Sequence, residues 1–174
     1  MKIVPIFADR LFAFHYESEP DNELSRLLKL WNDTFYLYQF IKENEEDIPK
    51  RKPVPTLINQ IIDDGNKIDE TLYKLSKNKD KTLEEFFKPL NNLEYRVLEL
   101  SKRKGRKNYL RLYAIRIDTN CYVITGGAIK FTHLMKDRAH TEKELRKIDQ
   151  CRDYLKDNGI IDADSFYEFL NEKL

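Results

Sequence analysis

The chain has 174 residues, of which 41% are hydrophobic and 35% charged, a composition typical of one globular domain whose core needs no disulfide or metal. The high charge, and the lack of an apolar run near the roughly 20 residues of a spanning helix, argue against an integral membrane protein. Two cysteines, Cys121 and Cys151, are too few for a disulfide framework, and the apolar stretch at the start is too short for a secretion signal. We therefore expect a cytoplasmic protein without metal or cofactor.

The near-neutral total charge hides a strong polarisation along the chain. Residues 102–140 carry ten basic and two acidic side chains, a local net charge of +8. Residues 17–47 carry nine acidic side chains against three basic ones. This separation predicts a molecule with a basic face that attracts polyanions.

The N-terminal part predicts a strand followed by a helix. Residues 10–17 have the aromatic content and near-alternation of a strand, and residues 3–7 are its expected partner. Residues 24–38 then carry apolar side chains at offsets of three, four and seven, which predicts the core stripe of one long helix with Asp21 as its N-cap.

A second long helix is predicted over residues 55–77, because its isoleucines and leucines fall on one face. The three prolines between residues 43 and 55 indicate a loop that joins the two helices. Thr82 begins a capping-box pattern that predicts a short helix ending near Pro89.

The apolar period then changes to two, which predicts an antiparallel meander. Its expected strands are residues 93–100, 109–117 and 121–132, and its expected connections are residues 102–106 and 118–120. Inside the last strand, the two consecutive glycines indicate a bulge, a bend or the close approach of another group.

Two helices are predicted at the C-terminal end. The first begins near His140 and ends before Gly159, and the second is capped near Asp162 or Asp164. The element order predicts an α+β fold with helices packed on an antiparallel sheet. We expect a single domain over residues 1–174, formed by an N-terminal strand and helices (1–92), a basic meander (93–132) and C-terminal helices (140–174).

Four short segments carry a resemblance to a known family. The strand Leu-Tyr-Ala-Ile-Arg-Ile at residues 112–117 is similar to the Leu-Tyr-Glu-Leu-Arg strand of HigB-type toxins. Residues 123–132 are similar to their Leu-x-Gly-Phe-x-Lys-Lys-Thr strand, with Lys130 alone in place of the paired lysines. Residues 141–145 and 87–90 are similar to the family's Thr-Pro-x-x-Glu-Ile helix start and its Lys-Pro-Leu segment. The chain thus resembles the RelE/HigB superfamily of type II toxin–antitoxin systems, and this implies their sheet arrangement.

The resemblance implies that the chain is a toxin that cuts mRNA, usually on the ribosome, by driving a ribose 2′-hydroxyl onto the adjacent phosphate without a metal. This reaction needs a proton acceptor, a cation for the charge on the phosphate and a donor for the leaving oxygen. The expected catalytic residues are Arg116 and Lys130, which match the family's basic strand positions, and His133 and His140, either of which can transfer a proton. The implied partners are mRNA and a cognate antitoxin, typically a helix-turn-helix protein.

Further basic residues are expected to bind RNA phosphates independently of sequence. They are Lys102, Arg103, Lys104, Arg106, Lys107, Arg111, Lys136 and Arg138. The run at 102–107 is also typical of a solvated turn that discourages edge pairing. Tyr113 and Tyr122 can stack on bases or pack within the sheet.

Three functions remain open on the sequence. The first is a ribonuclease toxin controlled by an antitoxin. The second is a module with the same fold that binds RNA or a protein without cutting. The third treats the resemblance as coincidence and leaves an interaction domain with one acidic and one basic face.

Overall fold

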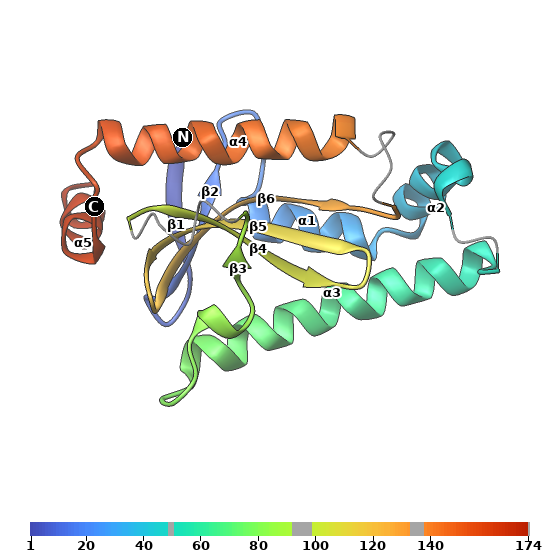
Figure 1. Ribbon diagram of the computed structural model, residues 1–174, viewed down its shortest axis with the longest axis horizontal. Helices are drawn as coiled ribbons and strands as arrows, with labels where there is room; N and C mark the ends of the chain where they lie inside the picture. Colours follow the sequence, from blue (N-terminus) through green and yellow to red (C-terminus); the bar gives the residue numbers. More distant parts are fainter. Residues whose placement is uncertain (49–50, 92–98, 133–137, 174) are drawn as a thin grey trace.

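The computed structural model describes residues 1–48, 51–91, 99–132 and 138–173 (Figure 1). Within these residues the fold is α+β, with six strands in one mixed sheet in the order β1-β2-β6-β5-β4-β3. The strands are β1 (Lys2–Phe7), β2 (Leu11–His15), β3 (Lys88–Pro89), β4 (Ser101–Lys107), β5 (Leu110–Asp118) and β6 (Cys121–Ile129).

Helices cover both faces of the sheet (Figure 1). They are α1 (Glu23–Asn32), α2 (Thr34–Glu43), α3 (Val54–Lys77), α4 (Arg138–Asp157) and α5 (Ala163–Glu172), with single 3-10 turns η1 (Glu45–Asp47) and η2 (Leu83–Glu85). Apolar side chains of α1, α2 and α3 form one core with the sheet, and those of α4 and α5 form a second core on the opposite face. No helix in the described ranges is both long and apolar enough to cross a membrane.

All strand pairs are antiparallel except β2 with β6. The hairpin of β1 and β2 confirms the predicted N-terminal pairing, and the series β4-β5-β6 confirms a three-strand antiparallel meander. The N-terminal hairpin joins this meander through parallel pairing, with Leu11 opposite Tyr122. The predicted α+β class is thus confirmed, but the prediction of an antiparallel sheet is wrong, because β2 pairs with β6 in parallel.

The first long helix was predicted wrongly as continuous. It is divided at Asp33, which ends α1 and whose side chain caps α2, and Asn22 rather than Asp21 caps α1. Because α2 starts in a new direction, Phe35 and Tyr38 are exposed instead of lying on the core stripe. Apolar periodicity alone cannot detect this break, since the stripe continues through it.

The first connection of the meander was also predicted wrongly. Residues 102–106 belong to β4, and the turn is formed by Asn108 and Tyr109, with Asn108 at a φ of 51°. A positive φ is tolerated better by asparagine than by most residues, which favours the turn at this position. Most of the strand predicted over residues 93–100, namely 93–98, lies outside the described residues.

Other predicted elements are confirmed with small shifts. The second long helix is α3, and the two C-terminal helices are α4 and α5. Asp162 caps α5 and exchanges hydrogen bonds with Ser165 in a capping box. The short helix expected after Thr82 is reduced to the single turn η2.

Candidate nucleic-acid interface

Basic side chains of the meander gather where β4 turns into β5. Arg106 and Arg111 are directly opposite each other in the register of the two strands. Lys104 lies two residues from Arg106, and Lys130 lies two residues past Ala128, the partner of Arg111 on β6. Because side chains alternate between the faces of a sheet, these four cations share one face. We call Lys104, Arg106, Arg111 and Lys130 the basic end.

The cations of the basic end are close enough to perturb one another. Burial lowers the pKa of Lys104, and the charges of Arg111, Lys130 and Arg106 lower it further. Arg111 is only 4% exposed and donates to two main-chain carbonyls, the closer being that of Asn108 at 2.6 Å. Within the described residues, no carboxylate forms an ion pair with any of the four. Their mutual repulsion would be relieved by a bound polyanion.

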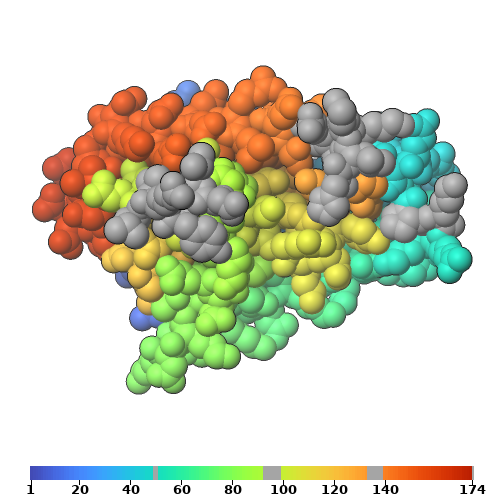
Figure 2. Space-filling model, viewed as in Figure 1, coloured from blue at the N-terminus to red at the C-terminus, as the bar shows by residue number. Residues whose placement is uncertain are grey.

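A pocket of about 190 Å³ at the basic end adds a fifth cation and an aromatic ring. Lys52 donates to Oε1 of Gln60 at 2.7 Å, and its Nζ lies 5.2 Å from the centre of the Tyr109 ring. The Tyr109 ring packs edge-on against Phe131, with ring centres 5.3 Å apart. In Figure 2 the hairpin of β4 and β5, in yellow, reaches the surface between α3 and α4.

A larger cavity of about 470 Å³ adjoins the basic end, between α1, α4 and the last residues of β6. Its lining reaches Ile129, the residue that precedes Lys130. The rings of Tyr36 and Phe40 form part of its wall, and Phe40 lies 5.7 Å from Phe131 of the neighbouring pocket. The contact between Phe40 and Phe131 therefore lies between the pocket and the larger cavity.

Six charged side chains line this cavity, which we call the charged cleft, and four of them form one network. Arg26 donates to both oxygens of Glu23, at 2.8 and 2.9 Å. Lys147 donates to Glu23 at 3.1 Å, and its Nζ lies 3.2 Å from Oε2 of Glu144. Glu23 is 1% exposed and Glu144 is 8% exposed. Removal of one member of such a network leaves an uncompensated buried charge, so the four residues depend on one another.

Glu144 is the least satisfied member of the charged cleft. Its Oε2 accepts no hydrogen bond from any described residue, because the approach of Lys147 is poorly directed. Burial raises the pKa of Glu144, and the charge of Lys147 opposes this effect. The carboxyl therefore has a raised proton affinity and one unused acceptor oxygen.

The two consecutive glycines of β6 are explained by close approach from both sides of the sheet, one of the predicted alternatives. A Cβ at Gly126 would overlap Oε2 of Glu144. A Cβ at Gly127 would lie 2.7 Å from the carbonyl oxygen of Arg111 and 2.8 Å from Cδ1 of Leu27. The strand also carries a register irregularity here, as the prediction of a bulge anticipated.

The chain's own residues are the basis for the chemistry of this site. No family model, curated protein or solved structure matches this chain. In the described part of the chain, no group of three histidine, cysteine, aspartate or glutamate residues is placed to hold a metal ion. What the site offers is cations, carboxylates, aromatic rings and one exposed histidine, His140, on the wall of the charged cleft.

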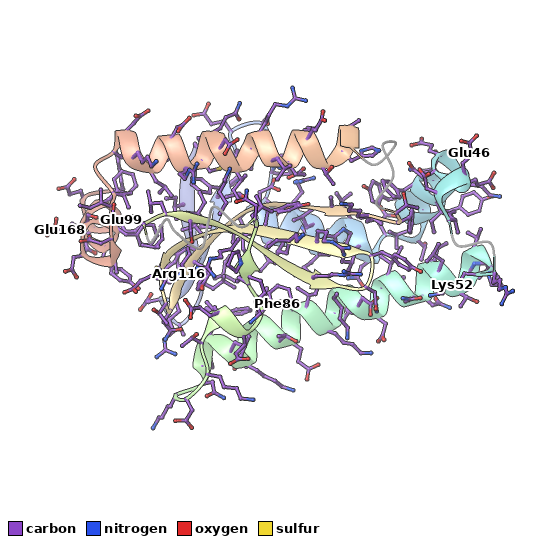
Figure 3. All side chains as sticks on the ribbon, viewed as in Figure 1. Glu46, Lys52, Phe86, Glu99, Arg116 and Glu168 are labelled. Atoms are coloured by element: carbon purple, nitrogen blue, oxygen red, sulfur yellow. The ribbon has the colours of Figure 1, made fainter. Side chains whose placement is uncertain are left out.

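Arg116 and Lys130, the two strand residues expected to be catalytic, do not lie together. Arg116 pairs with Tyr122 near one end of the β5–β6 ladder, whereas Lys130 follows Ile129 at the other end. Six residues of β5 separate the two positions, which corresponds to about 20 Å. In Figure 3 Arg116 lies toward the opposite end of the molecule from Lys52, which neighbours the basic end.

The environment of Arg116 is that of a structural residue. Its Nε donates to Oε1 of Glu84 at 2.9 Å, and its Nη2 donates to Thr119 at 2.9 Å. Its side chain is 16% exposed. These contacts fasten η2 and the β5–β6 turn to the sheet, far from the basic end.

The remaining expected RNA-binding residues are divided among several places. Lys102 donates to Asp149 on α4 at 3.1 Å, and Arg103 donates to Ser101 at 3.0 Å. Lys107 lines a separate pocket beside α3. Arg138 begins α4, but its side chain lies outside what the structure describes.

Two expected residues, His133 and Lys136, lie outside the described residues. Tyr113 and Tyr122 are 3% and 0% exposed, so packing in the sheet accounts for them and they cannot stack on a base in this conformation. His140 is exposed, and its ring lies 5.6 Å from that of Phe40.

The charged cleft was not predicted from the sequence. Glu23 and Arg26 lie within the acidic segment 17–47, where no pattern distinguishes them, and Glu144 lies within a segment that indicates only the start of a helix. A usable signal was present, since Glu144 and Lys147 are three residues apart on a helix that follows a Gly-Gly strand. The partner of this pair, Glu23, lies 121 positions away from Glu144, beyond the reach of any local pattern.

Proposed function

We propose that this chain binds single-stranded RNA through the basic end. The observation that carries the proposal is the gathering of four cations on one sheet face with no paired carboxylate among the described residues. Phosphates of a nucleic-acid strand supply the missing negative charge and release counterions on binding. Tyr109 and Phe40, next to these cations, offer rings on which unpaired bases can stack.

The salt dependence of RNA affinity tests this proposal. Contacts from the three cations other than the buried Arg111 give a slope of about −2.1 in a plot of log affinity against log salt, or about 20-fold between roughly 50 and 200 mM. Replacement of Lys104 and Arg106 by alanine leaves Lys130 and should reduce the slope to about −0.7. A matched control is the double substitution Lys2→Ala and Lys156→Ala, which removes two exposed positive charges elsewhere. Equal slopes for the two double variants would refute the proposal.

Cleavage of the bound RNA is a second candidate function, and the position of His140 favours it. His140 is exposed on the wall of the charged cleft, one helical turn before Glu144. An exposed imidazole and a carboxyl with a raised pKa are suited to act as proton acceptor and donor in attack of a 2′-hydroxyl on phosphate. Shortened transcripts with wild-type protein, and intact ones with His140→Gln at unchanged RNA affinity, are expected if this activity exists.

In the cell we propose the role implied by the RelE/HigB resemblance, a toxin restrained by a cognate antitoxin. The meander β4-β5-β6 followed by α4 supports a RelE-like arrangement of this part of the fold. Expression of the chain alone should arrest growth, and co-expression of the neighbouring gene's product should restore it. Harmless expression of a folded protein would refute the toxin role without affecting RNA binding.

A further inference from the structure

We propose that the pocket of about 190 Å³ at the basic end binds a phosphomonoester, the terminal phosphate at one end of an RNA strand. We call it the phosphate pocket. This inference rests on the proposed RNA binding and names the part of the RNA that is held most tightly. It starts from the pocket wall, whose described residues include four cations and no carboxylate. The cations are Lys52, Arg106, Arg111 and Lys130.

Arg111 is a buried cation without an acidic partner. The residue is 4% exposed, and no carboxylate in the described ranges forms an ion pair with it. Burial lowers the pKa of Arg111, and the charge of Arg106 lowers it further. An uncompensated buried charge is costly, so an anion that enters the phosphate pocket stabilises the guanidinium.

One edge of the Arg111 guanidinium is left for such an anion. Its Nη1 donates to the carbonyl oxygens of Asn108, at 2.6 Å, and Leu110, at 3.1 Å. Its Nε and Nη2 donate to no described residue, and neither atom is completely shielded from solvent. Because Arg111 lines the phosphate pocket, a ligand there can approach both atoms. The edge that they form matches two oxygens of one phosphate.

The remaining cations reach the phosphate pocket from three different segments. Lys52 lies just before α3, and its bond to Gln60 holds its ammonium group over the Tyr109 ring. Arg106 belongs to β4, and Lys130 follows the last residue of β6. Convergence of charge from separate segments suits a ligand of high charge density. A phosphomonoester carries about −1.5 to −2 charges at pH 7 and three acceptor oxygens, whereas an internal phosphodiester carries a single charge.

The size of the phosphate pocket also favours the end of a strand. Its volume of about 190 Å³ is smaller than the roughly 300–1,000 Å³ of sites that enclose a whole small ligand. It therefore holds a group smaller than a nucleotide. An internal phosphate has a nucleoside on each side and stays at the mouth, where the exposed Arg106 meets it. A terminal phosphate has one free side and can reach Arg111.

Binding of 2′-O-methyl uridine heptamers, measured by fluorescence anisotropy at constant salt, tests the inference. The fluorophore is on the central base, and the ends carry a 5′-phosphate, a 3′-phosphate or hydroxyl groups only. The wild-type protein should bind the 5′- or the 3′-phosphorylated heptamer about tenfold more tightly than the unphosphorylated one. An unphosphorylated octamer, which adds one internal phosphate, should have almost the same affinity as the unphosphorylated heptamer.

Substitutions within the phosphate pocket should weaken this preference. Lys52→Gln and Arg111→Gln should each reduce the ratio of the two affinities by at least about threefold. Because the loss of a buried arginine can also unfold the protein, Lys52→Gln provides the test that does not depend on Arg111. The matched control is Lys107→Gln, since Lys107 neighbours Arg106 on β4 but lines a separate pocket. It should retain the wild-type ratio.

Equal wild-type affinity for phosphorylated and unphosphorylated heptamers, or an unchanged ratio in Lys52→Gln, would overturn the inference and leave RNA binding intact. An octamer that gains as much affinity as a terminal phosphate provides would do the same, because added charge alone would then explain the effect. If uridine 5′-monophosphate binds as tightly as the phosphorylated heptamer, the assignment to an RNA end is wrong. Failure to bind any heptamer would overturn the proposed function as well.

Discussion

The glycine pair of β6 gives a sharp prediction about packing against the charged cleft. An alanine at Gly126 places its methyl group where Oε2 of Glu144 lies. The carboxylate has to move, and its arrangement with Lys147 is disturbed. Overpacking of this kind costs about 1–3 kcal/mol, so we expect Gly126→Ala to lower the free energy of unfolding by about 2 kcal/mol.

A second substitution separates this cause from a general intolerance of the strand. In a Glu144→Ala background the overlap at Gly126 disappears, and the new methyl group gains about 0.8 kcal/mol from burial. Gly126→Ala should then stabilise the protein by about 0.8 kcal/mol, which gives a coupling energy of about 3 kcal/mol between the two positions. Gly127→Ala should remain costly in both backgrounds, because its closest neighbour is the backbone of β5 at Arg111.

Urea unfolding followed by the fluorescence of Trp31 measures these differences. Trp31 is the only tryptophan and is 1% exposed, so its emission reports loss of the core. If Gly126→Ala costs the same with and without the Glu144 side chain, the close approach of Glu144 is not the reason for glycine at this position. If Gly127→Ala rather than Gly126→Ala is coupled to Glu144, the two glycines face the opposite sides of the sheet from those assigned here.

Three further predictions concern other parts of the molecule. The raised pKa of Glu144 means that the folded state binds its proton more tightly than the unfolded state, so the wild type should lose stability relative to Glu144→Gln as pH rises above about 4.5 in urea unfolding. Burial raises the pKa of Cys121 and Cys151 to about 12, so about one thiol in ten thousand is ionised near pH 8 and alkylation should be slow until the protein unfolds. Asp33→Ala should cost about 1 kcal/mol in the same unfolding assay, because it removes the side-chain acceptor for the amide of Tyr36.

Each of these predictions has an outcome that contradicts it. A rise in wild-type stability relative to Glu144→Gln with increasing pH would mean that the charged carboxylate is favoured in the folded state. Rapid alkylation of either cysteine under native conditions would contradict its burial. For the helix cap, Asp33→Asn serves as the control, since asparagine can keep the hydrogen bond; equal losses for both variants would exclude capping as the cause.

Elements with an apolar period were predictable from the sequence, and the basic strand was not. The core positions of α3, such as Ile61, Ile68 and Leu72, recur on one face and are buried as expected. In β4, Lys104 and Arg106 provide no apolar alternation, so this strand was assigned to a turn. It forms a strand because its backbone groups pair with β5, a pairing that the side-chain pattern of the segment itself does not indicate.

The candidate site was predictable in charge but not in geometry. The excess of basic residues in the meander predicted that Lys104, Arg106 and Arg111 lie close together on one face. The expectation that Arg116 and Lys130 belong to one catalytic site is wrong, because the motif places each residue on a strand but does not give the distance between them along the sheet. Only the Glu144 and Lys147 pair of the charged cleft has a local signal in the sequence, because their partner Glu23 lies 121 positions away from Glu144.

The parallel pairing of β2 with β6 has a consequence for how the protein folds. Leu11 cannot pair with Tyr122 until about 110 further residues have been synthesised. Closure of a loop of this length costs roughly 4 kcal/mol, whereas the hairpins form between near neighbours. At ordinary rates of translation, the apolar faces of α1 and α3 stay exposed to solvent for roughly 5 to 20 seconds before the sheet is complete. The N-terminal half therefore exposes its apolar surface longest during synthesis, and chains truncated before β6 should aggregate rather than fold.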